Sequence, residues 1–220
     1  MDVKGLRRRI VDSPDSLGGR ARARRWELFQ RFFPDIHELS VLDLGGTVET
    51  WRRSPVKPAK VTIINLFEPG ESTEATVIPL TGDACAAGEV LTAAEVDLDF
   101  DLIFSNSLIE HVGGHAKRLE LAREVRHLAP RHWIQTPYRY FPLEPHWIFP
   151  GMQFLPATIR TQIAAHWPLA HTRPDNIASA RESVLWTELV SVTEMRDYFP
   201  DSEILHERMV GLTKSLIAVR

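Results

Sequence analysis

Residues 41–51 read VLDLGGTVETW: an apolar run reaches an aspartate, and two glycines and a threonine follow. A glycine turn after a strand lets the backbone approach a ligand closely, and the next helix offers its first amide groups to an anion. Thr47 stands where a dinucleotide-binding loop usually continues with glycine, so the stretch also fits an ordinary tight turn. We expect Thr47 to open the following helix as its N-cap.

Around this stretch, short apolar or β-branched runs alternate with spacers that suit helices. The runs are LSVLDLG (39–45), VTIINLF (61–67), TVIPL (76–80), FDLIFSN (100–106) and HWIQTP (132–137). Runs that are apolar on both faces belong to a parallel sheet covered on both sides. The clearest helical spacer, HAKRLELAREVRHLAP (115–130), places apolar residues at helical intervals. The fold class is therefore α/β, with a doubly wound sheet.

The chain reads as one domain of 220 residues with four segments. We expect an N-terminal helical arm (1–37) that ends near Pro34, a cofactor-binding half (38–137), an acceptor lid or insertion (138–190), and a closing helix and hairpin (191–220). Four prolines in FPLEPHWIFPGMQFLP (141–156) exclude a regular helix and favour a shaped lid or a rigid connector. We read a helix near ATIRTQIAAHW (157–167), a polar insertion at 171–183, and an antiparallel pair from SEILHER and LTKSLIAV.

Composition limits the partners and the compartment. With 26 basic and 29 acidic side chains, the net charge of −3 gives no general attraction to nucleic acid. Arginines cluster at 7–9 and 20–25, as a solvated arm or as a surface for an anionic substrate or partner. A single cysteine, Cys85, excludes an intramolecular disulfide and reads as a small buried filler. No stretch resembles a signal peptide or membrane span, so we expect a cytoplasmic protein.

Polar groups stand at the ends of the expected strands. Asn65 lies about twenty residues after the glycines, where a ribose hydroxyl partner is expected. Asp83 is placed to accept a hydrogen bond from an exocyclic amine, with Leu66 and Ala84 as apolar neighbours. The fourth run leads into a further set at the same edge of the sheet: Asn106, Ser107 and His111.

In this order, the strand ends between Ser40 and Pro137 resemble the class I S-adenosylmethionine-dependent methyltransferases. The resemblance implies a Rossmann-like, seven-stranded, mostly parallel sheet with a reversed last strand, and S-adenosylmethionine as cofactor. It assigns the methionyl part to Asp43, Gly45 and Gly46, the ribose and adenine to Asn65 and Leu66, the adenine to Asp83 and Ala84, and the sulfonium to Asn106 and Ser107. Thr47 replaces a glycine of the fuller signature, and Asn65 replaces the usual acid.

The sequence lacks the motifs that are typical of three other enzyme classes. A short-chain dehydrogenase needs a Tyr-x-x-x-Lys pair, but Tyr138, Tyr140 and Tyr198 lack the lysine four positions later. The sequence also contains no Gly-x-Ser-x-Gly elbow and no Walker loop, which argues against hydrolase and NTPase readings.

Methyl transfer to a hydroxyl benefits from a general base, and His146 is the first candidate. Glu144, two residues away, would orient it or serve as a second base, and His111 is the alternative base. A structural, hydrogen-bonded histidine is the competing reading. Tyr138, Tyr140 and Trp147 surround the pair and suit a sugar or flat ring, or else pack the lid onto the sheet.

A looser similarity to actinobacterial single-domain sugar O-methyltransferases makes a saccharide hydroxyl the first acceptor to consider. The alternatives are a lipid, quinone or natural-product hydroxyl, or a non-catalytic binding module. We assign no metal site: mixed donors occur at Glu110, His111, His115, Glu144 and His146, but two glycines interrupt HVGGH as a helical zinc pair. Magnesium, which some family members use, and a homodimer are both compatible with the sequence.

Overall fold

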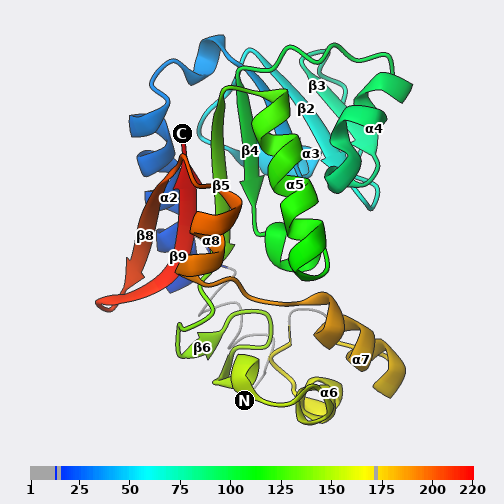
Figure 1. Ribbon diagram of the computed structural model, residues 1–220, viewed down its shortest axis with the longest axis vertical. Coiled ribbons are helices and arrows are strands. Elements are labelled where there is room, and N and C mark those ends of the chain that lie inside the picture. The colour runs from blue at the N-terminus through cyan, green and yellow to red at the C-terminus, as the bar shows by residue number, and fades with distance from the viewer. Residues whose placement is uncertain (1–12, 14–15, 171–172) are drawn as a thin grey trace.

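The computed structural model describes residue 13 and residues 16–170 and 173–220. A seven-stranded sheet lies at the centre of the fold, with the strand order β3-β2-β1-β4-β5-β9-β8 (Figure 1). Its strands are β1 (Ser40–Leu44), β2 (Lys60–Asn65), β3 (Val77–Thr81), β4 (Leu102–Asn106), β5 (Arg131–Pro137), β8 (Glu203–Met209) and β9 (Leu212–Val219).

The strand directions confirm the predicted fold class. Strands β1 to β5 are parallel, and the last strand, β9, runs antiparallel to both of its neighbours, β5 and β8. Chain order reverses direction across the sheet between β1 and β4. In open parallel sheets, ligands bind beyond the carboxyl ends of the strands at this point.

Helices cover both faces of the sheet. Above the first face lie α2 (Leu17–Phe32) and α3 (Val48–Arg53), and above the second lie α4 (Ala87–Ala93), α5 (Gly114–Leu128) and α8 (Val192–Tyr198) (Figure 1). Successive side chains of a strand point to opposite faces. In β1, for example, Val41 packs toward α2, while Leu42 packs toward α5.

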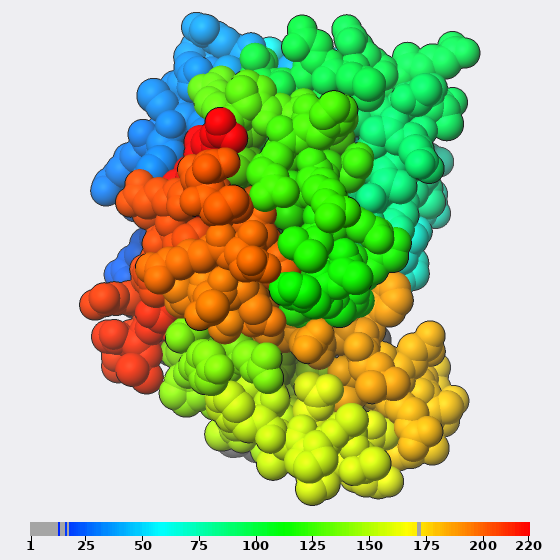
Figure 2. Space-filling view, viewed as in Figure 1, coloured from blue at the N-terminus to red at the C-terminus, as the bar shows by residue number. Residues whose placement is uncertain are grey.

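The predicted lid forms a lobe beyond the strand ends (Figure 2). It contains a hairpin of β6 (Leu143–Glu144) and β7 (Phe149–Pro150), then α6 (Ala157–His166) and α7 (Ile177–Trp186). Its own apolar cluster includes Trp147, Met152 and Val184. The interpretation of 171–183 as a polar insertion missed α7, which Asn176 starts with a capping box to Ser179. The four-segment division remains a prediction.

The arginine-rich arm is only partly a solvated surface. Arg7, Arg8 and Arg9 lie outside the described residues, while Arg20, Arg22 and Arg24 are exposed on α2. Arg25 turns inward, where it donates to Gln135 Oε1 at 3.0 Å and pairs with Glu207 at 2.7 Å.

The burial of Cys85 and the character of the helices bear on two further predictions. Cys85 is buried, as predicted, and burial raises the pKa of its thiol to about 12, so it is a filler rather than a nucleophile. None of the helices in the described ranges combines the length and the apolar character that a membrane span requires.

Candidate functional site

The turn after β1 is shaped by its two glycines. Gly45 has φ +85°, and a side chain there would meet Leu108 at 2.9 Å. A side chain at Gly46 would lie 1.7 Å from a carboxylate oxygen of Asp43. Thr47 then caps α3, its hydroxyl accepting a hydrogen bond from the Thr50 amide at 3.3 Å. The predicted N-cap is confirmed.

Asp43 lies beneath this turn and is 1% exposed. Its Oδ2 accepts a hydrogen bond from the Trp51 indole at 2.6 Å. Burial raises the pKa of Asp43 to about 7, and the indole hydrogen bond opposes that rise. Asp43 therefore packs against Gly46 of the turn and connects the turn to α3 through its hydrogen bond with Trp51.

Asn65, at the end of β2, is bound to the same turn. Its side-chain amide donates to the carbonyl oxygens of Gly45 at 3.1 Å and Gly46 at 2.8 Å, and its Oδ1 accepts from the Phe67 amide at 3.0 Å. An aspartate cannot donate these two hydrogen bonds. The departure from the usual acid thus has a local structural reason, and Asn65 fixes the glycine turn.

A cavity of about 370 Å³, the strand-end pocket, opens beside this turn. It holds six of the nine residues predicted to bind cofactor: Gly45, Asn65, Leu66, Asp83, Ala84 and Ser107. Asp43, Gly46 and Asn106 do not line it. Asp83 lines it while its Oδ1 accepts a hydrogen bond from the Cys85 amide at 2.9 Å.

Ser107 reaches this pocket through an unusual backbone conformation. Its φ is +57°, a region that residues other than glycine seldom adopt. Its amide donates to the Gln135 carbonyl at 2.9 Å, and its hydroxyl donates to Gln135 Oε1 at 3.2 Å. Because Arg25 donates to the same oxygen, α2 helps to fix Ser107.

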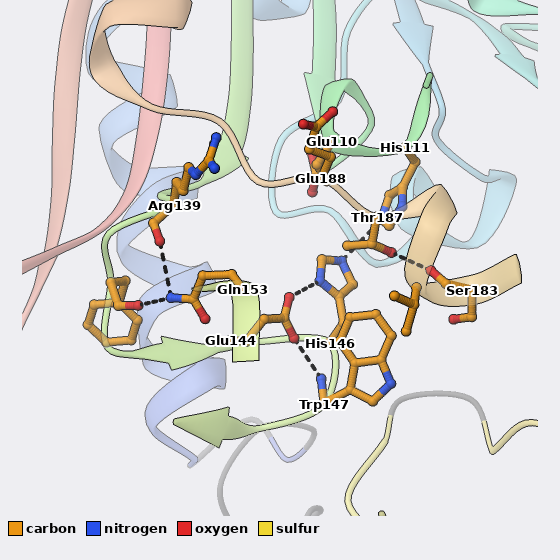
Figure 3. Close-up of polar contacts among 12 residues, drawn as sticks. Glu110, His111, Arg139, Glu144, His146, Trp147, Gln153, Ser183, Thr187 and Glu188 are labelled. Carbon is orange, nitrogen blue, oxygen red and sulfur yellow. Dashed lines mark hydrogen bonds and ion pairs between the residues drawn. The ribbon is translucent and has the colours of Figure 1, made fainter. Parts of the chain in front are cut away.

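The two candidate bases, His111 and His146, are in contact. Their Nε2 atoms lie 3.1 Å apart, and Glu144 Oε1 lies 2.7 Å from His146 Nδ1 (Figure 3). Glu144 is 2% exposed, and its other oxygen accepts from the Trp147 amide at 2.9 Å. A carboxylate only accepts, so it places a proton on Nδ1 of His146, and the lone pair of His146 Nε2 then faces Nε2 of His111.

Glu110 stands beside the histidines and is 1% exposed. Its Oε2 accepts from the Thr136 hydroxyl at 2.9 Å, whereas its Oε1 is buried with no hydrogen-bond partner among the described residues. Burial raises the pKa of Glu110, opposed mainly by the nearby His146. The cluster offers three possible metal-ligand atoms, which lie within 4.8 Å of one another and come one each from Glu110, His111 and His146.

A second cavity of about 590 Å³, the histidine pocket, is lined by both histidines and by Trp147 and α7. It shares four residues with the strand-end pocket: Leu66, Phe67, His111 and Trp186. The two cavities therefore adjoin at His111. Each has a volume that suits a small ligand.

Of the predicted acceptor aromatics, only Trp147 lines the histidine pocket. Tyr138 packs against the apolar cluster on the face of the sheet that α4, α5 and α8 cover. Tyr140 stacks on Phe154, and its side chain is 58% exposed. The packing alternative fits the contacts of Tyr138, and a role of either tyrosine in acceptor binding remains a prediction. The sequence interpretation missed Phe67 and the pocket residues of α7: Ser179, Glu182, Ser183 and Trp186. The capping sequence NIAS (176–179) was the available signal.

His115 takes no part in this cluster. Its Nδ1 lies 2.8 Å from the Tyr198 hydroxyl, and its Nε2 is 3.6 Å from Asp197. The glycines at 113 and 114 separate it from His111, as predicted, and α5 begins at Gly114.

Comparison with known proteins identifies the fold. No family model and no curated protein matches the sequence. Among solved structures, a SAM-dependent methyltransferase from Anabaena variabilis aligns with a TM-score of 0.53 at 15% identity, over 90% of this chain and 83% of that one. The chain has the class I methyltransferase fold.

Two further structures with this fold match over nearly their whole length. The N-methyltransferase NodS from Bradyrhizobium japonicum has a TM-score of 0.52 at 8% identity, over 94% of this chain and 97% of that one. Magnesium protoporphyrin IX methyltransferase from Synechocystis, solved with bound SAH, has a TM-score of 0.50 at 11% identity, over 99% and 93%. At these identities the likeness concerns the class I methyltransferase fold alone.

Proposed function

We propose that the protein is an S-adenosylmethionine-dependent O-methyltransferase that acts on a hydroxyl of a small polar acceptor, with a sugar or oligosaccharide as the first candidate. The observation that carries this proposal is the junction of the two pockets at His111. A donor in one pocket and an acceptor in the other would meet beside the histidine cluster. Alignment of two reactants supplies much of the acceleration in such a displacement.

The strand-end pocket fits the methyl donor. Gly45 exposes its backbone to this pocket without a side chain, and the apolar side chains of Leu66, Ala84 and Trp186 suit a purine face. Asp83, which lines the same pocket, would accept a hydrogen bond from the exocyclic amine of the adenine. Asp43 and Asn65 act behind this surface, by fixing the turn.

When bound, S-adenosylmethionine supplies an electrophilic methyl group, which the acceptor oxygen attacks as the carbon–sulfur bond breaks and leaves its electron pair on sulfur. The hydroxyl proton leaves at the histidine cluster, where Glu144 and His146 assist its removal. This arrangement favours a hydroxyl acceptor. A neutral amine attacks through its lone pair and needs no prior loss of a proton.

The lining of the histidine pocket supports a polar acceptor with an apolar face. Trp147, Trp186 and Phe67 offer aromatic surface, while Ser179, Glu182 and Ser183 offer hydrogen-bonding groups. Aromatic faces with polar groups beside them suit a sugar ring. A cytoplasmic location, the absence of a nucleic-acid partner and a homodimer remain predictions.

Calorimetry with S-adenosylhomocysteine tests the donor site. We expect measurable binding to the wild type and at least about tenfold weaker binding to Asp83→Ala, the scale of one lost hydrogen bond to a ligand. Asp83→Ser keeps an oxygen that can cap the turn at Cys85 and so separates loss of the cap from loss of the ligand contact. No binding to the wild type would refute the proposal.

Transfer from labelled S-adenosylmethionine to panels of sugars, lipids, quinones and amines tests the acceptor. His146→Ala should lower turnover about 100-fold or more with unchanged donor affinity, as expected for loss of proton transfer. His115→Ala is the control. Donor binding without transfer to any acceptor class would favour the binding-module alternative.

A further inference from the structure

We propose that Glu110, His111 and His146 bind a divalent first-row transition cation at the wall of the histidine pocket. The three residues come from two separate segments: the η4 turn (Ile109–His111), which follows β4, and the turn between β6 and β7. The role of this cation in catalysis, described below, rests on the proposed function. Its binding does not.

The distances suit a shared cation. Two imidazole nitrogens at about 2.0–2.1 Å from a tetrahedral zinc ion lie about 3.3 Å apart. The Nε2 atoms of His111 and His146 are 3.1 Å apart, and their rings are nearly perpendicular, at 85°. One carboxylate oxygen of Glu110 lies within 4.8 Å of one ligand nitrogen of each histidine, so the three groups surround one position.

Groups behind the ligands already orient them. Glu144 Oε1 accepts from Nδ1 of His146 at 2.7 Å, the contact that typically fixes a metal-binding imidazole and makes its other nitrogen a better ligand. The Trp147 amide in turn fixes Glu144, and the Thr136 hydroxyl binds one oxygen of Glu110. A histidine–histidine hydrogen bond alone does not account for the buried Glu110 beside it.

The charges also favour a cation. Oε1 of Glu110 is buried without a hydrogen-bond partner among the described residues, which is costly for a carboxylate unless a positive charge joins it. The described residues that line the histidine pocket include Glu182 but no lysine or arginine. Glu144 adds a second buried acid behind His146.

The donor set selects the type of ion. Imidazole nitrogen suits zinc and the other first-row transition ions, whereas magnesium prefers carboxylates and water. Two histidines and one carboxylate leave one or more coordination positions open, as in catalytic zinc sites. Because both histidines line the histidine pocket, an ion held by them would be accessible to an acceptor in that pocket.

The cluster would then act through the cation. A cation held by Glu110, His111 and His146 would supply Lewis acidity, which would lower the pKa of an acceptor hydroxyl in the histidine pocket and ease the loss of its proton at the cluster. Glu144 becomes a positioning residue for His146. Acceptors with two neighbouring oxygen atoms, such as a vicinal diol of a sugar, would chelate the ion and be preferred over isolated hydroxyls.

Competition with a chromophoric chelator for Zn²⁺ tests the site directly on the full chain. We expect one bound ion per chain and at least a tenfold loss of affinity in His111→Ala, His146→Ala and Glu110→Gln. Glu144→Gln should lose about 10- to 100-fold, as for other outer partners of metal-binding histidines. His115→Ala is the matched control and should bind Zn²⁺ like the wild type. Mg²⁺ should compete poorly.

Binding of S-adenosylhomocysteine to the same variants separates the two proposals. If Zn²⁺ does not bind, or binds equally to all variants, the cation proposal is overturned, while intact donor binding and transfer leave the proposed function standing. If Zn²⁺ binds as expected and no donor binds, the proposed function fails instead. Thermal unfolding with and without Zn²⁺ gives a second readout, because a ligand of the folded state raises the Tm of the wild type and of His115→Ala only.

Discussion

The side-chain amide of Asn65 donates a hydrogen bond of 2.8 Å to the carbonyl oxygen of Gly46 and thereby ties the end of β2 to the glycine turn after β1. A second bond from the same nitrogen reaches Gly45 at 3.1 Å. Neighbouring parallel strands present their carboxyl ends at one edge, so a short side chain on β2 reaches the turn of β1. This contact holds the turn in shape before any ligand arrives.

Placing at position 65 the acid that class I methyltransferases usually carry there should therefore weaken donor binding by this protein. Asn65→Asp loses both donated hydrogen bonds and sets a carboxylate against two carbonyl oxygens, so we expect about 10- to 100-fold weaker binding of S-adenosylhomocysteine by calorimetry. Asn176→Asp makes the same chemical change at an exposed helix cap, where aspartate is equally suitable, and should bind normally. Tighter binding to Asn65→Asp would show that position 65 serves the ribose instead.

Local patterns in the sequence were sufficient to predict the α/β class and most of its elements, whereas the reversed last strand of the sheet came from the resemblance to class I methyltransferases. The strand runs, the N-cap at Thr47 and the helix at 115–130 depend on neighbours a few residues away, and each appears where it was expected. The hairpin of β8 and β9 likewise follows from a short connection. These features need only periodicity and turn chemistry.

The site was less predictable because its contacts join distant residues. His111 and His146 were both named as candidate bases, but their contact across 35 positions depends on how the lid folds back over the strand ends. The role of Asn65 depends on a carbonyl 19 positions earlier. Helix α7 was missed because its polar and small residues lack a clear apolar stripe, although its cap was visible at Asn176.

Gly46→Ala should disrupt the turn through Asp43. The added methyl group would lie 1.7 Å from Oδ2 of Asp43, which accepts the Trp51 hydrogen bond, so the carboxylate must move and that bond must break. We expect a loss of about 1–3 kcal/mol in the free energy of unfolding, typical of overpacking, and weaker donor binding.

Gly88→Ala is the matched control for this substitution. Gly88 lies within α4, where alanine is favoured, and its nearest contact would be the flexible end of Glu124 at 3.3 Å. Denaturant unfolding and calorimetry of both variants provide the comparison. Equal behaviour of Gly46→Ala and the wild type would mean that Asp43 does not constrain the turn.

Arg118 fixes the segment that carries Glu110 and His111. This arginine is 1% exposed on α5, donates to the Ile109 carbonyl at 3.2 Å and pairs with Glu188 at 3.2 Å and Glu194 at 3.5 Å. Arg118→Leu should lower the free energy of unfolding by about 1–3 kcal/mol, since it leaves the backbone carbonyl oxygens of Ile109 and Glu188 without their hydrogen-bond donor, whereas the two glutamates remain partly exposed to water.

The exposed Arg123 of the same helix provides the control for Arg118. Arg123→Leu should change the free energy of unfolding by no more than about 0.5 kcal/mol, as surface substitutions usually do. Urea titrations followed by circular dichroism measure both variants. If they proved equally stable, the hydrogen bonds and ion pairs of Arg118 would have no net stabilising role.

His132 should make the stability of the protein depend on mildly acidic pH. Burial, aided by the positive charges of Arg220 and Arg126, lowers the pKa of its imidazole from 6.5 to about 4. Between these values the unfolded chain binds a proton that the folded chain does not, so stability rises with pH through this window and is fully present above it. Since one pKa unit corresponds to about 1.36 kcal/mol, this histidine alone should lower the free energy of unfolding by about 2 kcal/mol from pH 7 to pH 5.

The variant His132→Gln tests this linkage because it removes the titrating group while keeping a polar side chain near Ser202, which lies 2.7 Å from His132 Nε2. Its free energy of unfolding should be lower than that of the wild type at pH 7, because the ring also packs against Phe199. From pH 7 to pH 5, however, it should fall by about 2 kcal/mol less than the wild type. Parallel curves for the two proteins over this range would show that another group controls the acid sensitivity of the fold.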